Sequence, residues 1–203
     1  MIIRQEMPAE YTLIENLTRE AFWNKYKPGC DEHYILHHFR EDPAFIKELD
    51  CVIEEENEIV AHIMYCHVQI QCDDGAVLPA ILFGPISVAP AHQGKGYGSA
   101  LIRQTLEKAK DMGFGAVVIT GNPAYYHRFG FDSSSKFGVY LQGVPRTEEA
   151  PFSMALELIP GYFEHAVGTI VLPSLYNADP AAVDAFDTQF PPKEKLRLPG
   201  QLG

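Results

Sequence analysis

Apolar and polar residues recur along the first part of the chain at strand and helix spacing. Residues 2–4 predict a short strand, and Pro8 stands where a helix begins. Residues 27–29 end that helix, whose apolar positions are Tyr11, Ile14, Leu17, Ala21 and Phe22. Asp31 is placed to cap a second helix that runs to about Arg40.

The middle of the chain predicts three strands, at residues 49–53, 59–71 and 76–88. An acidic turn joins the first two strands, and Asp73-Asp74-Gly75 is a hairpin signal between the second and the third. Two prolines and Gly84 fall inside the third strand. Because proline cannot donate to a sheet ladder, they mark an edge, a bulge or a strand end.

An amphipathic helix and a buried strand follow. Residues 101–112 put apolar side chains on one helix face, and Gly113 supplies the stop. Residues 116–120 are four apolar residues and a threonine, as expected for a parallel strand buried on both faces. The later part of the chain predicts strands at residues 137–141, 152–158 and 168–172, and a short helix at 181–186.

Length and composition fit a globular protein. The 203 residues suffice for one large domain or a domain with an appendage, and 46% are hydrophobic against 21% charged. No apolar run has the length of a membrane span, and the N-terminus lacks the features of a signal peptide, so we expect a cytoplasmic protein. The net charge of −11 argues against a nucleic-acid partner and weakly favours a cationic substrate such as an amine.

Cysteine and histidine residues give little sign of a metal site or a thiol nucleophile. None of the four cysteines stands in a Cys-x-x-Cys pair, so free buried thiols are expected. His33 and His37 share one helix face, a spacing that can hold a metal. No recognisable acidic or cysteine ligands follow them, and a role facing solvent or lining an acceptor site is favoured. We therefore predict no metal.

The strongest chemical signal is a glycine-studded turn between the third strand and the amphipathic helix. It reads Gln93-Gly94-Lys95-Gly96-Tyr97-Gly98. Three missing Cβ atoms let the backbone approach a ligand, and the following helix adds unpaired N–H groups and a positive dipole end. Together these features suit a pyrophosphate. The glycine spacing fits neither a Walker loop nor a Rossmann fingerprint.

This loop resembles the acetyl-CoA-binding motif of the GCN5-related N-acetyltransferases (GNAT superfamily). The match is Q-x-x-G-x-G after a strand that ends V-x-P (Val88, Pro90). Asn122 and the run of residues 125–131, Tyr-Tyr-His-Arg-Phe-Gly-Phe, look like the family's downstream motif. That run is similar to a bacterial subgroup with a Tyr-Tyr-x-x-Phe-Gly-Phe motif.

The resemblance implies an α/β (α+β) GNAT fold. Its mixed central sheet has about six to seven strands, two of them parallel and splayed, with helices on both faces. Residues 1–159 would form the N-acetyltransferase domain, and residues 160–203 a C-terminal extension with a short strand and a Pro-rich tail. Whether the protein is a monomer or a homodimer stays open.

The resemblance also implies the chemistry, which is transfer of an acetyl group from acetyl-CoA to an amine of a small molecule or protein. The residues implied to bind acetyl-CoA are Ile86, Ser87, Val88, Gln93, Gly94, Lys95, Gly96, Tyr97, Gly98, Ser99 and Asn122. Tyr126 would be the acid that protonates the leaving thiolate, with Tyr125 as the competing residue. The base stays unassigned, because residues 76–88 contain no acid; Glu54, His62 and His67 are candidates. The alternative function is a non-catalytic acyl-CoA-binding regulatory module.

Overall fold

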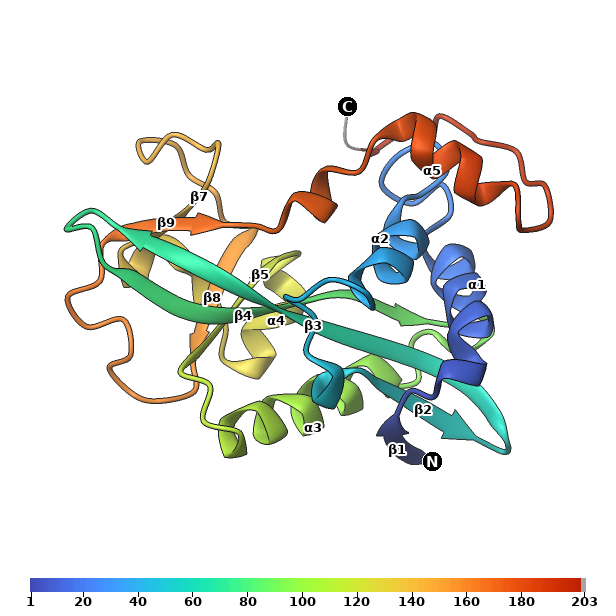
Figure 1. The fold of residues 1–203 in the computed structure, drawn as a ribbon, viewed down its shortest axis with the longest axis horizontal. Helices are drawn as coiled ribbons and strands as arrows, with labels where there is room; N and C mark the ends of the chain where they lie inside the picture. Colours follow the sequence, from blue (N-terminus) through green and yellow to red (C-terminus); the bar gives the residue numbers. More distant parts are fainter. Residues whose placement is uncertain (202–203) are drawn as a thin grey trace. The chain divides into compact units, whose positions relative to one another are not determined.

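The computed structural model describes residues 1–201, which fall into two compact units. The first unit consists of Met1–Met64, Pro85–Leu101 and the described part of Ser174–Gly203. The second unit consists of Tyr65–Gly84 and Ile102–Pro173. The chain passes from one unit to the other inside strands β3 and β4 and inside helix α3 (Figure 1).

Strands of the first unit pair in chain order. β1 (Ile2–Gln5) is antiparallel to β2 (Cys51–Glu55), with Gln5 opposite Cys51, and β2 is antiparallel to β3 (Glu58–Cys72). Glu56 and Asn57 join β2 to β3, and both have positive φ, 52° and 66°. Such a turn matches the twist of a tight hairpin, which confirms the predicted turn between these two strands.

Three helices belong to the first unit. α1 (Tyr11–Phe22) follows a short 3-10 turn at Pro8–Glu10, α2 (Glu32–Phe39) contacts α1, and α5 (Pro180–Asp187) contacts α2 (Figure 1). α1 ends before the predicted stop at residues 27–29. Asn24 has φ 59° there, and its side-chain Oδ1 accepts the N–H of Gly29, which turns the chain early.

The second unit contains a mixed sheet, as predicted. β4 (Val77–Val88) is parallel to β5 (Ala116–Thr120), which is antiparallel to β8 (Ser153–Glu157), and β8 also pairs with β6 (Asp132–Ser133). β9 (Gly168–Val171) pairs with β3 and with β7 (Val139–Leu141). α3 (Tyr97–Asp111) links β4 to β5, and a hydrogen bond of 2.8 Å joins Thr105 on α3 to Tyr65 on β3.

Two short elements have no counterpart in the sequence predictions. These are β6 and the single-turn helix α4 (Pro123–Tyr126). The remaining 3-10 turns are Lys47–Leu49, Pro90–His92, His127–Phe129, Ser134–Phe137 and Ser174–Asn177. Among the helices of the described residues, none is both long and apolar enough to cross a membrane.

Candidate active site

The glycine-studded turn lies in the first unit, between the end of β4 and the start of α3. Gly94 and Gly96 have φ of 76° and 91°, values that favour glycine, and a Cβ at either position would meet nothing within 4 Å. Gln93 donates from Nε2 to the carbonyl of Val88 at 3.1 Å, which ties the loop to the strand end. Gly98 is buried in the first turn of α3, while Gly94 and Gly96 are exposed. The loop therefore presents open backbone beside the N-terminus of a 15-residue helix.

The end of β4 is tied to α1 within the first unit. The Ser87 hydroxyl shares a hydrogen bond of 3.0 Å with Thr18 on α1, and both side chains are buried. Ile86 and Val88, on either side of Ser87, are half-buried. Three residues before Ser87, Gly84 has φ of 153°, so the backbone of β4 is irregular at the Gly84-Pro85 step, although the strand continues through it.

The predicted downstream motif lies in the second unit. Asn122 is the N-cap of α4, where its side-chain oxygen accepts the N–H of Ala124 at 3.0 Å. The Tyr126 ring packs among Phe83, Phe129 and Phe131, with centroid distances of 5.9, 6.4 and 6.1 Å.

Gly121 makes room for that ring. A Cβ on Gly121 would stand 2.3 Å from Cε2 of Tyr126, so only glycine leaves space for the ring in this position. Tyr125 packs differently, with the guanidinium of Arg128 4.7 Å from its ring centroid. The predicted site residues thus fall into two groups: residues 86–99 are together in the first unit, and Asn122 and Tyr126 are together in the second.

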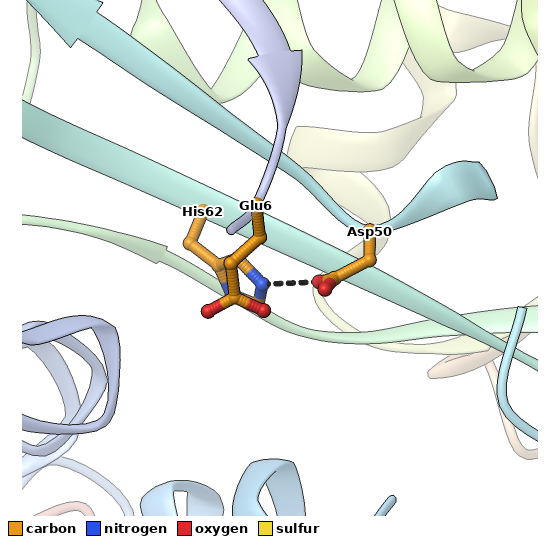
Figure 2. Close-up of side chains that lie close together, drawn as sticks. All are labelled: Glu6, Asp50 and His62. Carbon is orange, nitrogen blue, oxygen red and sulfur yellow. Dashed lines mark hydrogen bonds and ion pairs between the residues drawn. The ribbon is translucent and has the colours of Figure 1, made fainter. Parts of the chain in front are cut away.

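Sequence reasoning missed most of a buried polar cluster in the first unit, formed by Glu6, Asp50 and His62. Figure 2 shows the three side chains converging, and Nε2 of His62 lies 2.7 Å from Oδ1 of Asp50. His62 was a candidate base, but the sequence offered no partner for it. No local signal in the sequence distinguishes the other two, because Glu6 directly after β1 and Asp50 directly before β2 look like ordinary surface acids.

Burial governs the protonation of this cluster. Burial, and then the neighbouring Asp50 carboxyl, raises the pKa of Glu6 to about 8, and burial also raises the pKa of Asp50. Burial lowers the pKa of His62 to about 4, so the imidazole is neutral at neutral pH. The Arg40 guanidinium donates to both oxygens of Glu6, at 3.2 and 2.5 Å.

The same cluster is the group of described residues whose ligand atoms lie close enough to hold a metal, within 4.8 Å of one another. Arg40 already supplies the positive charge, and His62 already occupies an oxygen of Asp50. A divalent cation would have to displace a buried guanidinium, which is costly. The donor set therefore fits a hydrogen-bonded ionic cluster better than a metal site.

A second buried cluster ties the C-terminal segment to α1 and α2. Arg19 donates to both carboxylate oxygens of Asp187, at 2.5 and 3.0 Å, and Nε2 of His33 lies 3.1 Å from Oδ1 of Asp187. Burial lowers the pKa of His33 to about 4, although the Asp187 charge opposes that shift. His33 therefore contacts the carboxylate that also binds Arg19, and its ring packs against the rings of Phe186 and Phe190.

An open acidic cleft of about 580 Å³ lies in the first unit, between the β2–β3 hairpin and α1. Its carboxylates are Glu10, Glu20, Glu54 and Glu58. Arg4 pairs with Glu10 and Glu54 and offsets part of their charge. Ala89 and Pro90, just before the glycine loop, form another part of the wall.

Comparisons with known proteins agree with one another. A family model described as "Acetyltransferase (GNAT) domain" matches residues 3–133. The Escherichia coli (strain K12) protein named uncharacterized N-acetyltransferase YhbS is 28% identical over 150 residues, which cover 74% of this chain and 84% of YhbS.

Two solved structures are similar over most of the chain. E. coli YhbS in complex with CoA has a TM-score of 0.76 at 22% identity, over 87% of this chain and 92% of YhbS. A GNAT family acetyltransferase from Brucella melitensis in complex with acetyl-CoA has a TM-score of 0.69 at 27% identity, over 86% of this chain and 97% of that protein.

Proposed function

Because this chain belongs to the GNAT acetyltransferase family, we propose which of its residues bind acetyl-CoA and which one protonates the leaving thiolate. The chain has the GNAT fold and is an N-acetyltransferase that transfers an acetyl group from acetyl-CoA to an amine. The alternative of a non-catalytic acyl-CoA-binding module is therefore set aside. The observation that carries the proposal is the open glycine loop between β4 and α3.

Residues 93–99 bind the pyrophosphate of acetyl-CoA. Positive φ at Gly94 and Gly96 suits a backbone that presents its N–H groups to an anion, and a Cβ at either glycine would meet no atom of the described residues within 4 Å. Lys95 is exposed on the same loop and adds a positive charge. Gln93 fixes the loop to Val88, so the loop is ordered before the ligand arrives and loses less entropy on binding.

Residues 86–88 bind the pantetheine arm and the thioester carbonyl through their backbone. The Ser87 hydroxyl is hydrogen-bonded to Thr18, so the main chain of Ser87, rather than its hydroxyl, binds acetyl-CoA. An extended pantetheine arm can pair with such a strand as an added strand would. A backbone N–H at this point would stabilise the oxyanion that forms when the amine attacks the thioester.

Tyr126 is the acid, and Asn122 binds the arm near the thioester. A tyrosine hydroxyl titrates near ~10 and a thiol near ~8.5, so a neutral tyrosine can protonate a forming thiolate at modest cost. The side-chain oxygen of Asn122 caps α4. Its side-chain nitrogen is left to donate a hydrogen bond to acetyl-CoA. Gly121 supports the assignment of Tyr126, because it leaves the space in which that ring lies.

The subgroup, the domain bounds and the class of acceptor are also proposals. The motif of residues 125–131 supports membership of the Tyr-Tyr-x-x-Phe-Gly-Phe subgroup. Residues 160–203 extend the domain 1–159: β9 joins the sheet of the second unit, and α5 contacts α2 in the first. The acidic cleft and the net charge favour a cationic amine as acceptor. The cytoplasmic location and the homodimer stay predictions.

Ligand binding tests the loop, and thiol release tests the reaction. Thermal stability should rise with acetyl-CoA but not with NADH or ATP, by about 2.7 kcal/mol at 100 times the dissociation constant. Release of CoA thiol is then measured with a polyamine, an amino sugar, a lysine-containing peptide and a peptide with a free N-terminus. The absence of a selective shift with acetyl-CoA would show that the loop assignment is wrong.

A further inference from the structure

One face of the first-unit sheet carries three buried polar side chains. The N–H of Glu6 donates to the carbonyl of Asp50 at 3.1 Å, so the two residues are opposite each other across β1 and β2. Val52 is opposite His62 in the β2–β3 register, and side chains two apart on a strand share a face. Glu6, Asp50 and His62 therefore project from one face of three neighbouring strands.

The groups that face this cluster come from α1 and α2. Arg40, directly after α2, bonds Glu6 and also Glu15 of α1, and its guanidinium lies 3.9 Å from the ring centroid of Tyr11. His37 of α2 bonds Glu15 at 2.9 Å and is exposed, so this side of the network reaches water.

The buried charges do not balance without an additional proton. Glu6, Asp50 and Glu15 are 7%, 3% and 5% exposed, and Arg40 is the one guanidinium that contacts them among the described residues. Three desolvated carboxylates around a single cation are unfavourable, so the cluster must retain a proton. Glu6 is the residue that holds it, because burial and the Asp50 carboxyl raise the cost of ionising Glu6, while the hydrogen bond from Glu6 favours an ionised Asp50.

The cluster is adjacent to the end of β4 in the sheet. The N–H of Ala89 donates to the carbonyl of Val60 at 2.9 Å, which sets the antiparallel register of β3 and β4 at this point. In that register His62 is opposite Ser87. Nδ1 of His62 is buried without a hydrogen-bond partner among the described residues, so the ring keeps a lone pair that can accept a proton.

We propose that Asp50 and His62, supported by Glu6 and Arg40, form a proton relay that accepts the proton released by the acceptor's ammonium group. The proposal rests on the proposed function, because it places the reacting amine beside residues 86–88. In the step, an ammonium N–H bond breaks and the proton reaches Nδ1 of His62 through the Ser87 hydroxyl or a water. In the same step Nε2 of His62 gives its proton to Asp50, so the buried ring is not left charged, and the amine is left neutral to attack the thioester.

Asp50 and His62 are thus positioning residues, which act through Ser87 or water rather than on the substrate directly. Asp50 holds the imidazole in the tautomer whose Nδ1 is free to accept, since Nε2 donates to its carboxylate. The relay supplies a base where β4 itself carries no acidic side chain.

The kinetic test compares Asp50→Asn and His62→Gln with wild type and with the matched control His33→Gln. His33 is likewise fully buried in the first unit and likewise contacts a carboxylate, but it lies in the Arg19–Asp187 cluster. The assay follows thiol release from acetyl-CoA with the most active amine of the panel, between pH 6 and 10. Circular dichroism and the acetyl-CoA dissociation constant confirm that each variant is folded and binds its donor.

We expect Asp50→Asn and His62→Gln to lower kcat/KM by about 100-fold at pH 7. The loss should shrink toward pH 10, because the amine then loses its proton in water. The donor dissociation constant should stay within twofold of wild type, and His33→Gln should keep the wild-type pH profile. A loss of the same size at every pH would overturn the relay and leave a structural role.

Proton storage is tested without any acceptor, by isotope-edited infrared spectroscopy of the carboxyl groups in wild type and Glu6→Gln. Both proteins carry Glu32→Gln, because burial raises the pKa of Glu32 to about 7 and its carboxyl would otherwise contribute to the signal. A protonated buried carboxyl should then be present at pH 7 in the protein that retains Glu6 and absent in Glu6→Gln. If the protein that retains Glu6 holds no such proton, the relay is wrong even where acetyl-CoA binds and reacts. If acetyl-CoA does not bind, the proposed function fails independently. Addition and removal of Zn²⁺ is the control, and metal-dependent activity would contradict the relay.

Discussion

Arg19 and Asp187 lie 168 residues apart in the sequence and are joined side to side, with Nε 2.5 Å from Oδ1 and Nη2 3.0 Å from Oδ2. The Arg19 side chain is fully buried, and the hydrogen-bonded Asp187 carboxylate is its main compensating charge, since Glu20 lies 3.8 Å away. Burial alone would raise the pKa of Asp187, but the hydrogen bonds from Arg19 hold it below its usual value. This pair fixes the C-terminal segment to the first unit.

Removing the Asp187 charge should therefore destabilise the first unit. We expect Asp187→Asn to lower the free energy of unfolding by about 3 kcal/mol, because a buried guanidinium loses its partner. The chain's single tryptophan, Trp23, has its ring centroid 4.2 Å from Arg19 Cζ, so its fluorescence in urea reports this region. Asp184→Asn is the control, since Asp184 pairs with Lys195 on the surface, and equal losses in both variants would contradict the assignment.

Stability should fall as the pH rises from 6.5 to 8. Burial, and then Asp50, raises the pKa of Glu6 from 4.5 to about 8, so between these values the folded state binds a proton that the unfolded state lacks. That stabilisation is complete below pH 4.5 and is lost as the pH rises through 8. We expect a decline of about 2 kcal/mol between pH 6.5 and 8, measured by urea unfolding.

The contribution of the buried histidines to stability changes with pH in the opposite direction. It therefore limits the loss of stability with rising pH to the range above pH 6.5. Burial lowers the pKa of His33 and of His62 from 6.5 to about 4, so their contribution is present above pH 6.5 and is lost as the pH falls through 4. Glu6→Gln should give a nearly flat stability between pH 7 and 8. Burial raises the pKa of Glu32 to about 7, so Glu32→Gln should reduce the decline mainly below pH 7 and keep most of the decline between pH 7 and 8. A Glu6→Gln protein with the wild-type decline would contradict this account.

Gly96→Ala should weaken acetyl-CoA binding at least tenfold. A Cβ at this position has no protein neighbour within 4 Å, so the methyl group would stand in the space where the pyrophosphate is proposed to bind. Gly143→Ala is the matched control, because Gly143 has φ of 83° against 91° and equally open surroundings. Both variants should lose about 1 kcal/mol of stability from the left-handed backbone. Isothermal titration with acetyl-CoA should distinguish Gly96→Ala from Gly143→Ala. Similar dissociation constants for the two variants would argue against pyrophosphate binding at the glycine loop.

Tyr126→Phe should lower kcat about 10- to 100-fold and leave the dissociation constant of acetyl-CoA unchanged. Phenylalanine keeps the packing with Phe83, Phe129 and Phe131 but cannot donate a proton to the thiolate. Steady-state thiol release measures the effect, with Tyr125→Phe as the control. Wild-type turnover of Tyr126→Phe over the whole pH range would remove Tyr126 from the mechanism.

Gly121→Ala should act through the same tyrosine. Its Cβ would fall 2.3 Å from Cε2 of Tyr126, so the ring must leave its position. We expect kcat to fall as it does in Tyr126→Phe. The variant that combines Gly121→Ala with Tyr126→Phe should lose no more kcat than the more strongly affected single variant. Additive losses in that double-mutant cycle would mean that Gly121 contributes to turnover independently of the ring.

The sequence predicted the strands and turns whose conformation depends on neighbouring residues in the chain. The strand at residues 116–120 has the predicted bounds, because a short apolar run between glycine signals has one favourable conformation. The hairpin at residues 73–75 was likewise predicted, since the turn residues themselves favour that geometry. The single turn of α4 was missed, because four residues carry no periodicity.

The polar clusters escaped prediction for a different reason. His62 meets Asp50 across 12 residues and Arg19 meets Asp187 across 168, and neither pair has a signature at either end of that separation. Buried acids look like surface acids in a sequence, and only the sheet register shows that Glu6 and Asp50 are opposite each other. Sequence alone could therefore name His62 but not its partners.

The distance in sequence between Arg19 and Asp187 also bears on how the polypeptide folds as it is made. α1 is synthesised well before α5, so the Arg19 guanidinium waits for a counter-charge that follows 168 residues later. Domains usually form from the N-terminus onward during translation, but the first unit draws on three separate stretches of this chain. We expect this unit to complete its core only after α5 has left the ribosome, which prolongs the exposure of α1 and α2 to chaperones.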